Sequence, residues 1–281
     1  MLSVGCTDSY SRRVLTLFQL ILVALIQGVT EFLPVSSSGH LILLPNLTGL
    51  SDQGLAIDVA VHVGTLFAVM LYFWRDVAVA IGGIPRLLTG RIDTPGARLG
   101  FLLILATIPV VIVGLVIKQS GLDEAMRSVA VIGWSMLIFG IVLYWADRTG
   151  KEVQTARDWS IRDAIIMGMW QAIALIPGTS RSGITITGAR ALGYAREDAA
   201  KLAMLMSIPT IAASGVLLGI DVVSEGDASI IKDASIAAGF AFVAALFALS
   251  IMMRLLKSVS FTPYVIYRVV LGLVLLWIAY S

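Results

Sequence analysis

Long apolar runs constrain this chain more than any other feature of its sequence. Ten apolar segments can be recognised, and the longer ones have about the 18–22 residues that a helix needs to cross ~30 Å of hydrocarbon. They lack the two-residue alternation of barrel strands. Only 14% of the residues are charged, whereas a soluble domain has about a quarter. The sequence therefore predicts an all-α integral membrane protein.

The order of long and short segments repeats within the chain. We expect segments at residues 14–33, 37–49, 55–74, 98–118, 126–145, 161–177, 183–192, 199–220, 234–256 and 263–280. The stretch FLPVSSSG (32–39) aligns with LIPGTSRS (175–182) at an offset of 143, which pairs Pro34 with Pro177 and Ser37 with Ser180. These matches predict a single membrane domain, 1–281, built from two repeats at 14–145 and 161–280.

The second and seventh segments are too short to span. Their 13 and 10 residues cover less than about 20 Å as helix. Each follows a proline, which ends a helix, and a Ser/Thr/Gly cluster, which can cap the next one. Broken helices at matching points of two halves indicate a site within the membrane. We therefore expect ten helical segments in two inverted repeats of five, with six spanning helices and two re-entrant hairpins.

The distribution of Lys and Arg predicts the orientation. One side has five: Arg12, Arg13, Lys118, Arg127 and Lys232. The other has thirteen: Arg75, Arg86, Arg91, Arg98, Arg148, Lys151, Arg157, Arg162, Arg190, Arg196, Lys201, Arg254 and Lys257. The positive-inside rule assigns the second side to the cytoplasm, so both termini are expected outside it.

Residues 27–40, reading QGVTEFLPVSSSGH, form the first polar break. Gln27 and Glu31 lie on one helix face, and Ser36, Ser37, Ser38 and His40 follow the proline. The second break contains Gly178, Thr179, Ser180, Arg181, Ser182 and Thr185. Helix N-termini, hydroxyls and an arginine together favour an anion site. The residues predicted to bind phosphate are Ser36, Ser38, Gly178, Thr179, Ser180, Ser182 and Thr185.

An arginine at bilayer depth costs roughly 2.5–3.5 kcal/mol, and a bound anion would offset this. One arginine cannot balance both Glu31 and a diphosphate, so a divalent cation, Mg²⁺ or Ca²⁺, is expected. Glu31 and Gln27 are its predicted ligands. Ser37 and His40 are three residues apart on a helix face, and Ser37, His40 or an activated water could be the nucleophile.

Other polar residues have simpler interpretations. His62 is expected to be structural, and Asp58 and Asp198 to cap helices. Arg190, Arg196 and Lys201 are expected to be charges at the cytoplasmic edge. The single cysteine, Cys6, excludes an intrachain disulfide.

Two motifs resemble the undecaprenyl-diphosphate phosphatase family of the bacitracin-resistance type. These are QGVTE (27–31) with PVSSSGH (34–40), and PGTSRSGIT (177–185). The resemblance runs from about residue 14 to the end. It implies a hydrolase of the bacterial plasma membrane that converts undecaprenyl diphosphate to the monophosphate for peptidoglycan synthesis. It points to Glu31, Ser37, His40 and Arg181 as catalytic residues. Many family members have Glu where Gln27 stands here.

Two alternatives stay open at this point. Membrane acid phosphatases carry similar fragments, but Thr187 stands where their motif requires a histidine. A transporter or flippase for the lipid carrier would use inverted repeats and the same anion site. The expected partners are undecaprenyl diphosphate and membrane lipid, with no nucleic acid; a homodimer is left open.

Overall fold

The computed structural model describes residues 16–49, 53–122, 126–224 and 228–281. Within them it contains eleven α-helices, one 3-10 helix and no strand longer than a single bridge. The elements are α1 (Leu17–Phe32), α2 (Ser37–Thr48), α3 (Gly54–Tyr72), α4 (Trp74–Leu88), α5 (Pro95–Ser120), α7 (Val129–Thr149), η1 (Ala156–Asp158), α8 (Ile161–Ile173), α9 (Arg181–Ala191), α10 (Arg196–Ser224), α11 (Ala228–Leu255) and α12 (Thr262–Tyr280). Cys6 lies outside the described residues.

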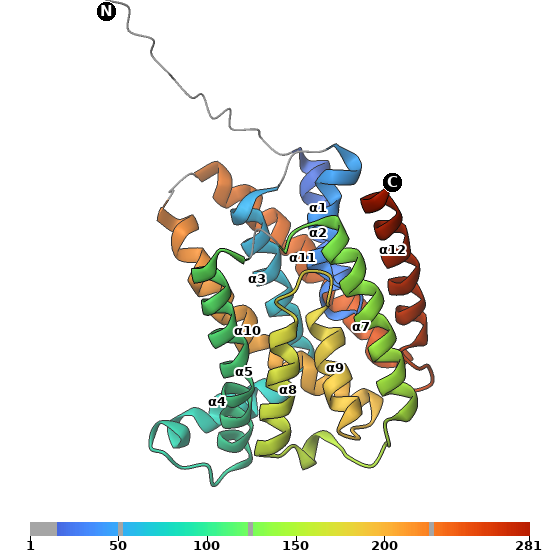
Figure 1. Ribbon diagram of the computed structural model, residues 1–281. Coiled ribbons are helices and arrows are strands. Elements are labelled where there is room, and N and C mark those ends of the chain that lie inside the picture. Colours follow the sequence, from blue (N-terminus) through green and yellow to red (C-terminus); the bar gives the residue numbers. More distant parts are fainter. Residues whose placement is uncertain (1–15, 50–52, 123–125, 225–227) are drawn as a thin grey trace, which may run out of the picture.

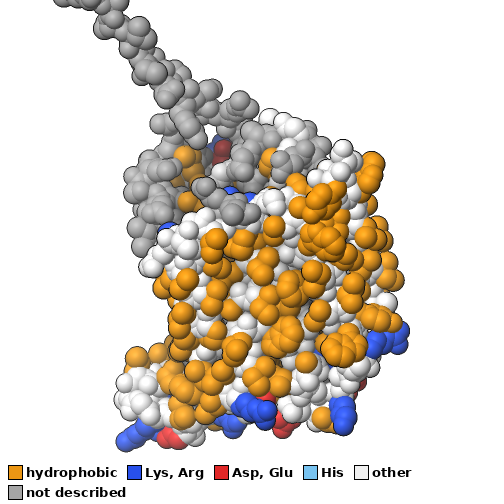
Figure 2. Space-filling view, in the orientation of Figure 1, with side chains coloured by type: hydrophobic (Ala, Val, Ile, Leu, Met, Phe, Trp, Pro, Cys, Tyr) orange, Lys and Arg blue, Asp and Glu red, His pale blue; other side chains and the backbone are white. Residues whose placement is uncertain are grey.

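Six of these helices, α3, α5, α7, α10, α11 and α12, are long and apolar enough to cross a membrane. Each coincides with a segment predicted to span, which confirms the all-helical, multi-pass prediction. Figure 2 shows hydrophobic side chains over the middle of the molecule and charged side chains along its lower edge. This banding is what a bilayer requires of a protein surface.

Serine and threonine residues start several helices, as their capping chemistry predicts. The hydroxyl of Thr94 accepts the Ala97 N–H at 3.2 Å at the start of α5. Ser128 does the same for α7 and Ser160 for α8, at 3.2 and 3.1 Å. Each cap satisfies a backbone donor that would otherwise lack a partner at the helix end.

One expected connection is instead a helix. Gly82, Gly83 and Pro85 stand between the expected segments 55–74 and 98–118, but all three lie inside α4, which packs against α5. The reason is close packing, because a Cβ on Gly83 would lie 2.1 Å from the backbone nitrogen of Ala97. The glycine permits helix contact here and does not form a turn.

The same use of small residues holds the long helices together. Helix α11 packs against both α1 and α3. A Cβ on Gly28 would lie 2.6 Å from the Ala244 Cβ, and one on Gly64 would lie 2.2 Å from the Ala238 carbonyl oxygen. Side chains at these glycines would push α11 away from α1 and α3, and α1 carries the first half of the first polar break.

The two short helix pairs lie in opposite halves of the molecule. In Figure 1, α1 and α2 are in the upper half, α8 and α9 are in the lower half, and both connections turn near mid-height. The tips meet: the Ser182 hydroxyl donates to the Leu33 carbonyl at 3.0 Å. A Cβ on Gly39 would lie 3.6 Å from the Gly178 Cα. Residues about 145 positions apart in sequence therefore form one region.

The structure corrects the alignment of the two breaks. Ser36 caps α2 and Ser180 caps α9, so the equivalent residues are 180 − 36 = 144 positions apart, and the predicted offset of 143 is wrong here. The second loop has one more residue between its proline and its cap. As a result Ser37 corresponds to Arg181, and each is the first residue of its short helix.

Candidate active site

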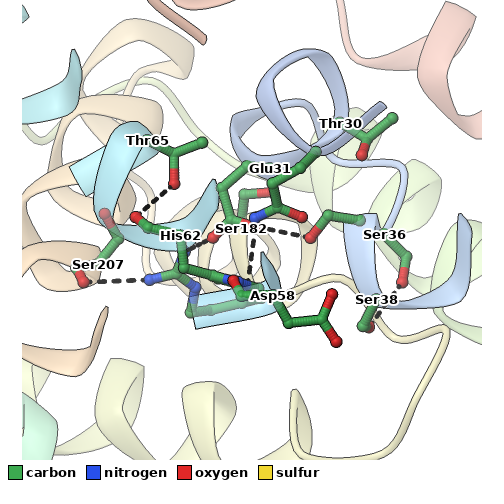
Figure 3. Close-up of polar contacts among 12 residues, drawn as sticks. Thr30, Glu31, Ser36, Ser38, Asp58, His62, Thr65, Ser182 and Ser207 are labelled. Atoms are coloured by element: carbon green, nitrogen blue, oxygen red, sulfur yellow. Dashed lines mark hydrogen bonds and ion pairs between the residues drawn. The ribbon is translucent and has the colours of Figure 1, made fainter. Parts of the chain in front are cut away.

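Glu31, in the last turn of α1, is the centre of the polar region. Its side chain is only 5% exposed. Oε2 accepts hydrogen bonds from the Ser37 hydroxyl at 2.6 Å and from Gln27 Nε2 at 2.8 Å. Oε1 forms an ion pair with Arg181 Nη2. The carboxylate thus connects both polar breaks, and Figure 3 shows it between Ser36 and Ser38 of the first break and Ser182 of the second.

Ser37 and Arg181 reach Glu31 because of the backbone just before them. Ser36 has φ 75° and Ser180 has φ 69°, and they are the non-glycine residues with positive φ in the described part of the chain. Such a conformation is unfavourable for L-residues and is found where a fold requires it. Their hydroxyls cap Gly39 N at 3.3 Å and Gly183 N at 3.2 Å.

The arrangement concentrates positive potential around Glu31. The N-termini of α2 and α9 carry the partial positive charge of helix ends. Arg181 adds a full charge, with a side chain 17% exposed, and its Nη1 donates to the Ser207 carbonyl on α10 at 3.2 Å. Two helix ends and an arginine can bind an anion with several oxygens.

Most hydroxyls predicted to bind phosphate already have partners within the protein. Ser36 and Ser180 cap helices, and the exposed Ser38 hydroxyl lies 3.4 Å from that of Ser36. Ser182 donates to the Leu33 carbonyl, and Thr185 donates to the Arg181 carbonyl at 2.8 Å. Gly178 has φ 88°, and a Cβ there would lie 2.6 Å from the Ile132 carbonyl. Thr179 is buried, and no hydrogen-bond partner of its hydroxyl is found among the described residues. Their role in phosphate binding remains a prediction.

His40 does not pair with Ser37 in this structure. Its Nδ1 is 2.6 Å from the Ser36 carbonyl and its Nε2 is 2.6 Å from the Tyr267 hydroxyl. In the part of the chain that the structure describes, no hydrogen bond joins His40 to Ser37 or to Glu31. The expected nucleophile and base are therefore neighbours in sequence with different partners.

His62 lies at the site, although its sequence context predicts a structural role. Its Nε2 is 3.9 Å from Glu31 Oε2, and its Nδ1 is 2.7 Å from the Asp58 carbonyl. Figure 3 shows His62 beside Glu31. Asp58 lies inside α3, whose N-cap is Gln53, so its predicted capping role is wrong. The general rule that ionisable residues in a span mark function would have found His62.

The same rule would have found Arg268, which stands alone in the last apolar segment. It lies in α12 and is fully buried. Its Nη2 donates to the Thr179 carbonyl at 2.8 Å and to the Gly178 carbonyl at 3.2 Å. Arg268 therefore contacts the backbone of the second break.

The capacity of the site for a cation is limited by its own hydrogen bonds. Among the described residues there is no group of three His, Cys, Asp or Glu side chains that could hold a metal ion. Both Glu31 oxygens accept from protein donors. Gln27 Oε1 is buried without a hydrogen-bond partner in the described structure, so this oxygen is not used by the protein's own hydrogen bonds.

Comparison with known proteins gives consistent matches over nearly the whole chain. The family model described as "Bacitracin resistance protein BacA" matches residues 20–274. The "Undecaprenyl-diphosphatase" of Ruegeria pomeroyi is 71% identical and that of Dinoroseobacter shibae is 70% identical; each alignment covers 95% of this chain and 100% of the relative. "Undecaprenyl-diphosphatase 1" of Rhodospirillum rubrum is 47% identical over 94% of this chain and 95% of the relative.

Proposed function

The chain belongs to the bacitracin resistance protein BacA family, and from this premise we propose that Glu31, Ser37 and Arg181 are its diphosphatase centre. The protein is a multi-pass membrane hydrolase that converts undecaprenyl diphosphate to undecaprenyl phosphate and inorganic phosphate. This reaction recycles the lipid carrier for peptidoglycan synthesis. The observation that carries the site assignment is that one buried carboxylate contacts the first residue of both short helices.

Arg181 is the group that we propose binds the terminal phosphate. Its guanidinium is now paired with Glu31, and an arriving phosphate competes for the same fork. The N-termini of α2 and α9 provide further donors for the phosphate oxygens. This binding mode requires the Glu31–Arg181 pair to open, which is consistent with the partial exposure of Arg181.

Ser37 is the nucleophile that the geometry supports best among the three candidates. Its hydroxyl donates to Glu31 Oε2 at 2.6 Å, so the carboxylate can accept the proton as Ser37 Oγ bonds to the terminal phosphorus. The bond from that phosphorus to the bridging oxygen breaks, and undecaprenyl phosphate leaves. Water then cleaves the phosphoserine, releases inorganic phosphate and restores the hydroxyl.

Glu31 and Gln27 are the residues that would hold a divalent cation, Mg²⁺ or Ca²⁺, together with diphosphate oxygens. Gln27 Oε1 is available now, and Glu31 gains capacity when Arg181 turns to the phosphate. A few protein oxygens combined with phosphate oxygens are typical Mg²⁺ ligation. The cation would neutralise part of the diphosphate charge.

The membrane placement completes the proposal. We infer that α1–α2 and α8–α9 are re-entrant hairpins of two inverted repeats, 14–145 and 161–280. Their opposite positions and meeting tips support this. The isoprenoid tail would then lie in lipid, with the protein in the bacterial plasma membrane and its thirteen-cation side in the cytoplasm. A homodimer remains a prediction.

Phosphate release from undecaprenyl diphosphate by the purified protein tests the proposal. We expect release by the wild-type protein, a large loss in Ser37→Ala, and inhibition by EDTA that added Mg²⁺ reverses. A phosphorylated Ser37 trapped by rapid acid quench would identify the nucleophile. Activity of Ser37→Ala close to wild type would overturn the assignment, and transfer of lipid across liposomes without phosphate release would favour a transporter.

A further inference from the structure

Both tips of the proposed site rest on two consecutive residues of α12. The Tyr267 hydroxyl is 2.6 Å from His40 Nε2 in the first hairpin. Arg268 Nη2 donates to the carbonyls of Gly178 and Thr179 in the second hairpin. Helix α12 packs mainly against α7, so these contacts are an additional link to the hairpins.

In the first tip the contact passes through His40 to the backbone. The Ser36 carbonyl can only accept, so His40 Nδ1 carries the proton of their 2.6 Å hydrogen bond. In the neutral imidazole, Nε2 then accepts from the Tyr267 hydroxyl. The two rings also stack, with centroids 5.7 Å apart and planes 9° from parallel. The Ser36 carbonyl thereby fixes the tautomer of His40, and Tyr267 fixes the orientation of its ring.

In the second tip the contact is direct. Arg268 is completely buried, and its Nη2 also lies 3.4 Å from the Ser135 carbonyl on α7. Among the described residues, Nε and Nη1 of Arg268 have no hydrogen-bond partner. A buried guanidinium is costly in a membrane protein. Arg268 therefore is not explained by stability alone, because an apolar residue would fill the same space at lower cost.

The held carbonyls lie just before the residues that contact Glu31: that of Ser36 directly before Ser37, and that of Thr179 one residue further from Arg181. Because the peptide group is planar, fixing a carbonyl also fixes the opposite direction of the next N–H group. The Ser36 carbonyl thus sets the Ser37 N–H, and the Thr179 carbonyl sets the Ser180 N–H immediately before Arg181. Ser36 and Ser180 also have the unfavourable positive φ described above, where external support is needed.

We propose that Tyr267 and Arg268 are positioning residues that hold the two tips in register around the diphosphate. His40 is then part of the clamp on Ser36 and is neither the nucleophile nor the base. The inference rests on the proposed function for its activity readout. It assigns α12, which contributes nothing to either sequence motif, a defined part in catalysis.

Conservative variants separate positioning from chemistry. Tyr267→Phe keeps the ring and removes the hydroxyl; we expect kcat to fall about tenfold with little change in KM, as for loss of one hydrogen bond. His40→Gln keeps an N–H donor but no base, and should retain at least about a tenth of wild-type kcat, whereas His40→Ala loses about 100-fold. If kcat falls equally in His40→Gln and His40→Ala, and both variants lose the same titration from the pH dependence of kcat, His40 is a base. That result would overturn the proposal that His40 only positions Ser36.

A double-mutant cycle tests the order of contacts. Tyr267→Phe should have no further effect in the His40→Ala background, whereas Arg268→Met should still lower kcat there. Arg268→Lys should restore most of what Arg268→Met loses. If Tyr267→Phe still lowers kcat tenfold in the His40→Ala background, Tyr267 does not act through His40, and this part of the proposal is overturned.

A measurement independent of activity distinguishes the positioning role of Tyr267 and Arg268 from the proposed diphosphatase function. The chain has two histidines, so ¹⁵N NMR of labelled protein gives two ring systems, assigned with His40→Gln. We expect His40 to be protonated at Nδ1 and its Nε2 signal to move in Tyr267→Phe. If the wild-type protein releases no phosphate but this signal moves, the diphosphatase assignment fails and the clamp stands. An unchanged signal overturns the clamp whatever the activity.

Discussion

Two carboxylate–arginine clusters in this molecule have the same chemistry and opposite settings. Glu31 and Arg181 meet between the hairpin tips. Asp147 meets Arg190 and Arg196 at the lower end of the molecule, with Asp147 Oδ1 accepting from Arg190 Nε at 3.1 Å and from Arg196 Nε at 2.8 Å. Arg190 was predicted to be an edge charge, but it is only 1% exposed. Both clusters are buried, so burial alone does not separate them.

The difference lies in how completely each cluster is satisfied. All three nitrogens of Arg190 have acceptors, including the carbonyls of Tyr194 and Gly150. The second oxygen of Asp147 accepts the Phe261 N–H at 3.2 Å. At Glu31, by contrast, every hydrogen-bond partner among the described residues is a side chain, that of Gln27, Ser37 or Arg181, and Gln27 Oε1 is unused. A saturated cluster fixes helix ends in place, and an unsaturated one can exchange partners with a substrate.

The largest expected effect comes from breaking the saturated cluster. Asp147→Asn removes the buried counter-charge of two arginines and leaves them only the half-exposed Glu152, at 2.9 Å from Arg196 Nη1 and 3.6 Å from Arg190 Nη2. Loss of one partner of a buried pair costs about 3–5 kcal/mol. We expect the thermal unfolding midpoint in detergent to fall sharply while kcat per folded molecule stays near wild type. A wild-type midpoint would show that the cluster is not structural.

The second prediction concerns Arg181 at the proposed site, where we expect catalysis to be lost and stability to be kept. Arg181→Lys keeps a cation beside Glu31, so the unfolding midpoint should change little. The lysine cannot present a bidentate fork to phosphate, and we expect kcat/KM for undecaprenyl diphosphate to fall about 10²–10³-fold. Arg190→Lys is the matched control at the other cluster, with the midpoint falling and catalysis of the folded protein retained. Equal behaviour of the two lysine variants would remove the distinction between the clusters.

The third prediction concerns Gln27, whose Oε1 has no hydrogen-bond partner among the described residues. Gln27→Glu places a second carboxylate within hydrogen-bond distance of Glu31, where Gln27 Nε2 now donates at 2.8 Å. Two like charges at this distance favour a shared proton or a cation. We expect the Mg²⁺ concentration for half-maximal activity to fall about tenfold, equivalent to about 1.4 kcal/mol. An unchanged Mg²⁺ dependence would argue that position 27 does not contribute to cation binding.

The sequence predicted the spans and the meeting of the two breaks because hydropathy and proline act locally. Apolar length identifies α5 or α12, and Pro34 ends α1, whatever the rest of the fold does. The partners of His40 and Arg268 were not predictable from the sequence. They depend on where α12 packs in space, and α12 is more than 80 residues away from either tip in the sequence. Helix α4 was not predicted for the same reason: a glycine such as Gly83 permits either a turn or a close helix contact, and only packing decides.

The smallest effect is expected where a pair of the same residue types is exposed. Arg86 and Asp93 approach to 3.1 Å near the end of α4, with side chains 50% and 53% exposed. Water and salt screen such a pair, which contributes about 0–1 kcal/mol. Asp93→Asn should therefore shift neither the unfolding midpoint nor kcat beyond experimental error. A loss comparable to that of Asp147→Asn would mean that burial and saturation do not set the worth of these pairs, and the contrast between the two clusters would need another cause.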